Sequence, residues 1–239
     1  MDTDVDPSIA PPRTGSAATV VLLRDGERGL ELLLAERPSD RGSFRGAWVF
    51  PGGAVDEADA AGGPVDSEPA ARRAAVRETL EETGLVVDPA ELVPFSLWTP
   101  PEGVEKRLQT RFFAARMPDG EIRLAPDEFV AAEWIRPVDA LQRHTAGAMT
   151  LYPPTWVTLH GLLDAASVDE ALAALRAGQV RPYVGRFTDD RTALYWQEDE
   201  HFDAERRADS AVPDDGTDAE GPRHRLMMDR LPWVYLNSF

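Results

Sequence analysis

The chain has 239 residues, 43% of them hydrophobic, which is enough for a substantial core. Its formal net charge of −17 argues against nucleic acid as a partner, because phosphate backbones require a basic surface. The lack of cysteine excludes disulfides and thiolate chemistry, and the sequence contains no apolar run of about 18 residues that would predict a membrane span. We therefore expect a cytoplasmic protein that binds neither nucleic acid nor membrane. The four histidines are scattered and form no spaced metal pair (His144, His160, His201 and His224).

The first part of the chain predicts a leader followed by a hairpin. Residues 1–15 mix Asp, Pro, Ser and Thr without periodicity, which is typical of a disordered leader. Residues 17–23 and 30–35 are apolar runs separated by turn residues, and this pattern indicates two antiparallel strands. We expect them to open a mixed sheet in a domain that spans residues 16–166.

A polar loop is predicted over residues 36–46, ahead of a short strand at 47–50. The loop carries Arg37, Arg41 and Arg45. Guanidinium groups bind phosphate oxygens bidentately, so a loop with three arginines could bind phosphate. The alternative is that each arginine is an ordinary solvated charge.

A helix is predicted from about residue 70 to residue 83. Alanine, a strong helix former, is frequent over 70–76, Pro69 suits a first helical turn, and Gly84 can adopt the left-handed conformation that ends a helix. The residues between 60 and 65, rich in Gly and Ala, predict a loop ahead of it.

Three glutamates of this helix predict a metal site. Spacings of three and four residues place Glu78 beside both Glu81 and Glu82 on one face, where each like-charged pair costs on the order of 0.2 to 0.5 kcal/mol. A divalent cation removes this repulsion, and all-oxygen ligands favour Mg²⁺ first and Mn²⁺ second. The alternative is a solvated acidic helix face. Arg77 lies four residues before Glu81, which predicts an intrahelical ion pair that holds a ligand carboxylate.

The rest of the chain predicts more strands and a helical layer. Residues 92–99 and 107–116 indicate a second hairpin, and residues 128–135 run into a further strand. Apolar spacings predict helices at 137–143, 154–166 and 168–177. A C-terminal extension over 167–239 alternates strand-like pieces with an acidic segment near 198–222, which we expect to be mobile because few apolar side chains can anchor it.

The run from Arg77 to Leu85 resembles the second half of the signature of the Nudix hydrolases: R, E, an aliphatic residue, any residue, E, E, any residue, G and an aliphatic residue. Two departures stand out. Thr79 occupies the aliphatic position, and the spacing from Gly53 to Arg77 is ten residues longer than the family's.

The long spacing leaves the first glutamate of the signature undecided. Counting forward from Gly53 places it at Asp59, whereas counting back from Arg77 places it at Pro69, beside Glu68. Both acids remain candidates.

The resemblance implies a fold and a reaction. The expected fold is α/β (α+β): a Nudix-type α/β/α sandwich with a mixed central sheet, plus the C-terminal helical and β extension. The expected activity is hydrolysis of the pyrophosphate bond of a nucleoside diphosphate-linked small molecule, with Mg²⁺ or Mn²⁺. A homodimer is left open.

The resemblance also assigns residues. Glu78, Glu81 and Glu82 would hold the metal together with a backbone carbonyl at Gly53. Family members recruit an acid from a loop before a strand to activate water, so Glu128 is the first choice, ahead of Asp127 and Glu133. The candidate substrate-binding residues are Arg37, Arg45, Arg107 and Arg111.

Further segments resemble the long coenzyme A diphosphatase branch of the family. They are Arg37 with residues 48–53, the interrupted signature, residues 98–100 and 107–113, and the Leu-Tyr-Pro-Pro-Thr run at 151–155. This implies coenzyme A or an acyl-coenzyme A as the substrate. ADP-ribose or NADH hydrolysis is the alternative activity. A Nudix module that binds a nucleotide without cleaving it is another alternative, although the three retained glutamates favour an enzyme.

Overall fold

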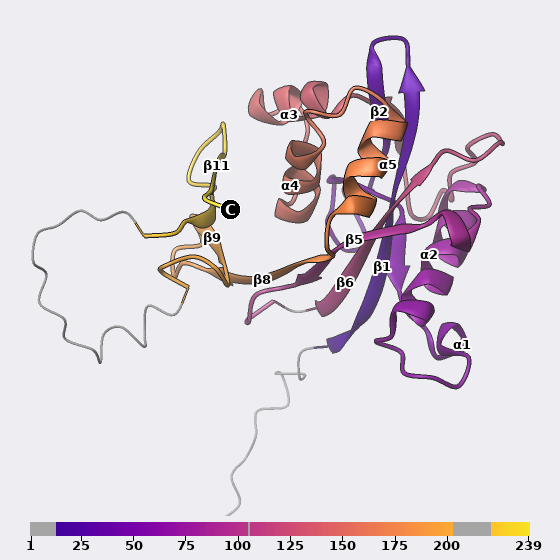
Figure 1. Ribbon diagram of the computed structural model, residues 1–239, viewed down its shortest axis with the longest axis horizontal. Helices are drawn as coiled ribbons and strands as arrows, with labels where there is room; N and C mark the ends of the chain where they lie inside the picture. The colour runs from indigo at the N-terminus through magenta and orange to yellow at the C-terminus, as the bar shows by residue number, and fades with distance from the viewer. Residues whose placement is uncertain (1–12, 105, 203–220) are drawn as a thin grey trace, which may run out of the picture.

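The computed structural model describes residues 13–104, 106–202 and 221–239 (Figure 1). The elements in chain order are β1 (Arg13–Gly26), β2 (Gly29–Glu36), β3 (Trp48–Val49), β4 (Gly52–Ala54), α1 (Glu57–Ala60), α2 (Glu68–Thr83), a short 3₁₀ helix η1 (Pro89–Glu91), β5 (Val93–Thr99), β6 (Lys106–Arg116), β7 (Ala131–Ile135), α3 (Pro137–Thr145), α4 (Pro153–Gly161), α5 (Val168–Ala177), β8 (Arg181–Phe187), β9 (Ala193–Trp196), β10 (His224–Met227) and β11 (Val234–Asn237).

These strands form one mixed sheet. Its order is β11-β10-β9-β8-β5-β6-β1-β2-β3, with β4 added beside β1 and β7 beside β2. The β1–β6 and β5–β8 pairs are parallel and the other pairs are antiparallel. The mixed sheet expected from the sequence is therefore confirmed.

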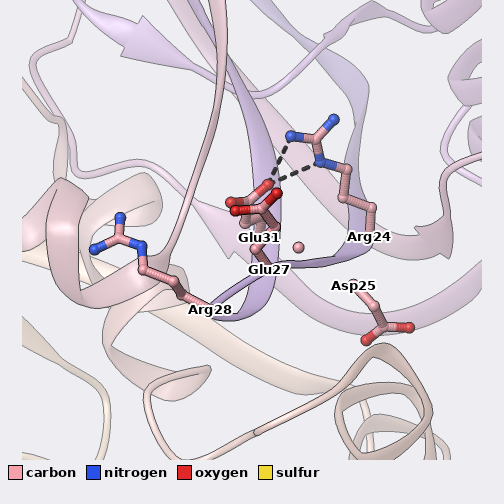
Figure 2. A pocket seen from close by; sticks show the side chains of 6 residues that line it. Arg24, Asp25, Glu27, Arg28 and Glu31 are labelled. Carbon is pink, nitrogen blue, oxygen red and sulfur yellow. Dashed lines mark hydrogen bonds and ion pairs between the residues drawn. The ribbon is translucent and has the colours of Figure 1, made fainter.

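The predicted first hairpin is present as β1 and β2, and its turn contacts α5. Arg24 reaches across the two strands to Glu31, with Nη2 2.7 Å from Oε2 (Figure 2). Asp25 accepts a hydrogen bond of 2.8 Å from the backbone N–H of Val168, the first residue of α5. The hairpin therefore helps to hold the helical layer against the sheet.

Helices cover both faces of the sheet, which gives the expected α/β/α sandwich. Successive residues of β1 alternate between two cores: Val21 packs with α4 and α5, and Val20 packs with α2. Figure 1 shows α2 on one side of the strands and α3, α4 and α5 on the other. The buried residues in the first half of α2 are alanines, whose small side chains let the helix pack close to the strands.

The helix α2 has Pro69 in its first turn and ends at Gly84, as predicted, and its N-cap is Ser67, which was not singled out from the sequence. Ser67 accepts a hydrogen bond from the N–H of Ala70 at the N-cap, and Gly84 ends the helix with φ 74°. Thr79, at the expected aliphatic position, is fully buried, and its hydroxyl donates to the carbonyl of Ala75 at 2.7 Å. A threonine is tolerated there because the helix backbone satisfies its hydroxyl.

The C-terminal extension continues the central sheet, because β8 pairs with β5. The strand β1 begins at Arg13, so residues 13–15 belong to the sheet and not to the leader. At the start of the acidic segment Asp199 is buried against Arg225. Residues 1–12 and 203–220 lie outside the described residues, and the expected mobility of the acidic segment stays a prediction. None of the helices in the described ranges combines the length and apolar character needed to span a bilayer.

Candidate active site

Two glycines of β4 lie beside the carboxylates of α2. Gly52 and Gly53 pair with Thr19 and Ala18 of β1. A Cβ at Gly53 would collide with the Glu78 carboxylate, and a Cβ at Gly52, whose φ is 152°, would collide with the Ala18 carbonyl oxygen. The position of Gly52 therefore requires glycine, because its positive φ and the backbone of β1 leave no space for a side chain, whereas a side chain at Gly53 would displace the Glu78 carboxylate.

Glu82 is the most buried of the three glutamates, with 4% of its surface exposed. Its Oε2 accepts a hydrogen bond of 2.8 Å from the N–H of Gly52, and its Oε1 lies 3.8 Å from Nη1 of Arg37. Burial raises the pKa of Glu82 to about 8, and the charges of Glu78 and Glu128 act in the same direction. Gly52 thus contributes an N–H that positions the carboxylate, a contact that the sequence did not indicate.

Arg77 connects the other two glutamates. Its Nη1 lies 2.8 Å from Oε1 of Glu78 and 3.2 Å from Oε2 of Glu81. The predicted intrahelical pair with Glu81 is therefore present, although the Glu81 side chain is 58% exposed. Burial raises the pKa of Glu78, whereas Arg77 acts in the opposite direction.

The acid that faces Arg77 is Asp59. Its Oδ2 lies 2.8 Å from Nη2 of Arg77, and it is 6% exposed. Burial opposes ionisation of Asp59, but the hydrogen bonds and charge of Arg77 prevail and hold its pKa below the usual value. Glu68 instead pairs with Arg72 at 2.7 Å. Of the two acids that the long spacing left open, Asp59 is the one that contacts the signature arginine.

The extra residues that lengthen the spacing between Gly53 and Arg77 lie between α1 and α2, and the contact of Arg77 with Asp59 is present despite them. Nη2 of Arg73 donates to the carbonyl oxygen of Ala60 at 3.2 Å, and its Nε donates to the carbonyl oxygen of Asp59. Arg77 also donates to the carbonyl oxygen of Ala54 at 3.0 Å. Arg73 therefore holds the C-terminal end of α1, and Arg77 joins α1 to the last residue of β4. The residues after α1 form the loop that was predicted over 60–65.

Glu128 lies close to the buried carboxylate. Its Oε2 is 3.0 Å from Nη1 of Arg37, the same nitrogen that lies 3.8 Å from Glu82, and the Glu128 side chain is 46% exposed. The two alternative acids are placed differently: Asp127 is almost fully exposed near Arg41, and Glu133 pairs with Arg143 at 2.6 Å.

The four candidate substrate arginines differ in position. Arg37 is engaged by two carboxylates, and Arg107 donates to the carbonyl oxygen of Pro100 at 3.0 Å. Arg111 shares a row of the sheet with Gly53, because Ala18 pairs with both, so two strand spacings place it about 10 Å from that glycine. Among the described residues, no hydrogen bond or ion pair is formed by the side chains of Arg45 and Arg111.

The donor atoms at this site have the chemistry that a hard divalent cation requires. They are not arranged as a complete set of ligands around one point. Glu78 and Glu82 bring buried negative charge against the backbone of Gly52 and Gly53, and their donor atoms are all oxygens. Over the part of the chain that the structure describes, no three acidic or histidine side chains stand grouped in a ligating arrangement. Glu81 would have to leave Arg77 to join the other two.

The known proteins that resemble this chain are Nudix proteins. The family model described as the NUDIX domain matches residues 13–154. A NUDIX hydrolase from Alicyclobacillus acidocaldarius is 25% identical with a TM-score of 0.62, over 72% of this chain and 100% of that one. A MutT NUDIX hydrolase from Burkholderia pseudomallei is 24% identical with a TM-score of 0.47, over 63% of this chain and 98% of that one. The chain belongs to the Nudix family and is a Nudix hydrolase.

Proposed function

We propose that this hydrolase cleaves the pyrophosphate bond of a nucleoside diphosphate derivative in a divalent-metal-dependent reaction, with coenzyme A or an acyl-coenzyme A as the preferred substrate. The observation that carries the reaction is the convergence of Glu78 and Glu82 on the backbone of Gly52 and Gly53. Such buried carboxylates gain most from a cation, since burial alone already raises the pKa of both.

Glu78 and Glu82, with Glu81 after it is released from Arg77, are the residues that would hold Mg²⁺ or Mn²⁺. When bound, the ion neutralises phosphate oxygens and lowers the pKa of water. Asp59 holds Arg77 in place, and Arg77 in turn orients Glu78. The chain thus supplies a carboxylate pair whose positions are fixed through α1 and β4.

Glu128 is the proposed general base. Its carboxylate is half-exposed, so water can reach it, and Arg37 holds it near Glu82. A base must lie within hydrogen-bond reach of the proton that it removes, directly or through one water molecule. The loop position of Glu128 allows this reach, whereas the ion pair of Glu133 with Arg143 directs that acid elsewhere.

Coenzyme A carries a 3′-phosphate that ADP-ribose lacks. A preference for coenzyme A therefore depends on a cationic side chain that binds this phosphate. In a chain with a net charge of −17, that phosphate requires a local arginine. Arg111 and Arg45 are suited to this role because neither has a partner among the described residues, and Arg111 lies on the sheet face that α2 covers. Arg37 is committed to Glu82 and Glu128, so it would act on the pyrophosphate side.

The test compares kcat/KM for coenzyme A, its 3′-dephospho form and ADP-ribose in the presence of Mg²⁺. We expect coenzyme A to exceed the dephospho form by about 10- to 100-fold, the effect of one charged hydrogen bond. Arg111→Gln or Arg45→Gln should reduce that ratio, whereas Arg28→Gln, on the exposed turn shown in Figure 2, should not. Equal rates for the two forms, or faster cleavage of ADP-ribose, would replace coenzyme A with a general nucleoside diphosphate substrate.

A further inference from the structure

Two exposed aromatic rings, Phe44 in the loop over 36–46 and Tyr152 at the start of α4, are in contact. Phe44 is 54% exposed and Tyr152 is 40% exposed. Their ring centroids are 4.8 Å apart with an angle of 75° between the planes, an edge-to-face contact. Both rings stay partly exposed although they contact each other, so the pair presents apolar surface to the solvent.

The backbone at Phe44 is held in an unfavourable conformation. Its φ is +56°, in the left-handed region that glycine and asparagine adopt readily and a bulky side chain rarely does. The Phe44 carbonyl accepts a hydrogen bond of 3.0 Å from the N–H of Ala47, which closes the turn. A glycine would satisfy this turn with less strain. The surrounding loop therefore imposes a conformation that keeps an aromatic ring exposed, and strain of this kind gathers at functional sites.

Both rings are tied to the Arg37 loop. The N–H of Arg37 donates to the carbonyl of Ala47 at 2.9 Å, and a chain of three residues from Ala47 to Phe44 spans at most about 10 Å. On the other side, the N–H of Trp48 donates to the carbonyl of Thr150 at 2.9 Å, two residues before Tyr152. The aromatic pair is therefore anchored to the loop whose arginine contacts Glu128.

We propose that Phe44 and Tyr152 form the stacking subsite for the nucleobase of the substrate. This rests on the proposed function, since a nucleoside diphosphate with its pyrophosphate at Glu78 and Glu82 extends its ribose and base away from the metal ligands. An aromatic ring stacks on any base through the π-faces, and rings set at 75° offer the base one face and one edge. Arg45 follows Phe44 in the same loop.

The test measures binding and not turnover. AMP carries a base and ribose 5-phosphate does not, so titration calorimetry with each, in the presence of Mg²⁺, isolates the contribution of the base. Phe44→Asn is the main variant, because asparagine tolerates the left-handed backbone and preserves the fold. It should weaken AMP binding by about 5- to 100-fold and leave ribose 5-phosphate unchanged. Tyr152→Ala should act in the same way, whereas Tyr152→Phe should keep AMP affinity.

A matched control is Phe239→Ala, which removes another exposed phenylalanine (64% exposed) near the C-terminus and should leave AMP binding unchanged. In turnover, Phe44→Asn should raise KM for nucleotide substrates and retain kcat. The subsite is overturned if AMP binds the wild type no more tightly than ribose 5-phosphate, or if folded Phe44→Asn binds AMP like the wild type. A wild type that binds AMP through Phe44 and cleaves no nucleoside diphosphate derivative would instead overturn the proposed function alone.

Discussion

Two buried carboxylates in this molecule have opposite surroundings. Asp199, whose side chain is fully buried, accepts from Nε and Nη2 of Arg225 at 2.7 and 2.8 Å and from the N–H groups of His224 and His201 at 2.9 and 2.8 Å. All its acceptor positions are satisfied by the chain. This carboxylate joins the segment after β9 to β10.

Glu82 is nearly as buried, but it receives one N–H from Gly52, and the nearest arginine nitrogen stays 3.8 Å away. Its pKa rises to about 8, mainly through burial. A satisfied buried carboxylate stabilises a fold, whereas an under-satisfied one can be retained for a ligand that supplies the missing charge. The difference separates a structural ion pair from a proposed metal ligand without reference to sequence motifs.

The strongest way to break this comparison is Glu82→Gln. We expect kcat/KM to fall by more than about 100-fold, the upper end of the usual loss for a residue that only orients a metal ligand, because a neutral amide cannot serve as an anionic ligand. The amide oxygen can still accept the N–H of Gly52, so the unfolding midpoint without metal should not fall. Turnover and urea denaturation are measured on one preparation. Wild-type turnover in a folded variant would refute the assignment.

Asp199→Asn tests the other carboxylate of the comparison, which we assign to stability and not to catalysis. Removal of one partner from a buried ion pair costs about 3 to 5 kcal/mol, so the free energy of unfolding should drop by about 3 kcal/mol while the folded protein keeps its kcat. Asp229→Asn is the matched control, since its exposed pair with Arg230 at 4.0 Å should be worth less than 1 kcal/mol. An unchanged free energy of unfolding in Asp199→Asn would show that the pair does not stabilise the fold.

Asp59→Asn sharpens the comparison, because Asp59 is a buried acid that acts through Arg77. A group that orients a ligand is worth about 10- to 100-fold in activity or metal affinity, and we expect a loss in that range. Glu68→Gln, which removes the partner of Arg72, should leave kcat/KM unchanged. Equal losses in the two variants would mean that the contact of Asp59 with Arg77 has no special role.

The smallest effect concerns pH and His224, which is fully buried beside Glu198 and Tyr235. Burial lowers its pKa below the usual 6.5, against the opposing effect of Glu198 and Asp199. The unfolded chain therefore takes up the proton first, so the contribution of His224 to stability is present above pH 6.5 and is lost as pH falls.

Urea denaturation at pH 7.5 and pH 5 measures this effect. The stability difference between the wild type and His224→Gln should narrow on acidification, by at most about 1.4 kcal/mol per pH unit. The titration of Glu82 is common to both proteins and cancels. A constant difference across the range would contradict the lowered pKa of His224.

The sequence predicts the local structure around the candidate site well where the signal is local. The helix α2 is predicted from its alanine content, from Pro69 and from the terminal glycine, and the structure confirms its end at Gly84. The choice between Asp59 and Glu68 could not be made by counting, because an insertion shifts the count from one side. The three-dimensional contact of Arg77 with Asp59 favours Asp59 over Glu68.

The sequence also misses the contacts that the acidic segment near 198–222 makes at its start, for a related reason. Composition treats the segment as one unit, but Glu198 and Asp199 contact His224 and Arg225, which come about 25 residues later. Long-range ion pairs leave no local pattern. In the same way, the donation from Gly52 to Glu82 joins a strand to a helix 30 residues away and could not be deduced from the signature.

The most direct test of the central claim, that Glu78 and Glu82 bind a divalent cation, is the thermal unfolding midpoint with and without Mg²⁺ or Mn²⁺. At 100 times its Kd, a metal that binds only the folded state adds about 2.7 kcal/mol, or about 5 to 10 °C for a chain of this size. The wild type and Asp199→Asn should both show this shift, and Glu82→Gln should lose it. An equal metal-dependent shift in Glu82→Gln would contradict the assignment.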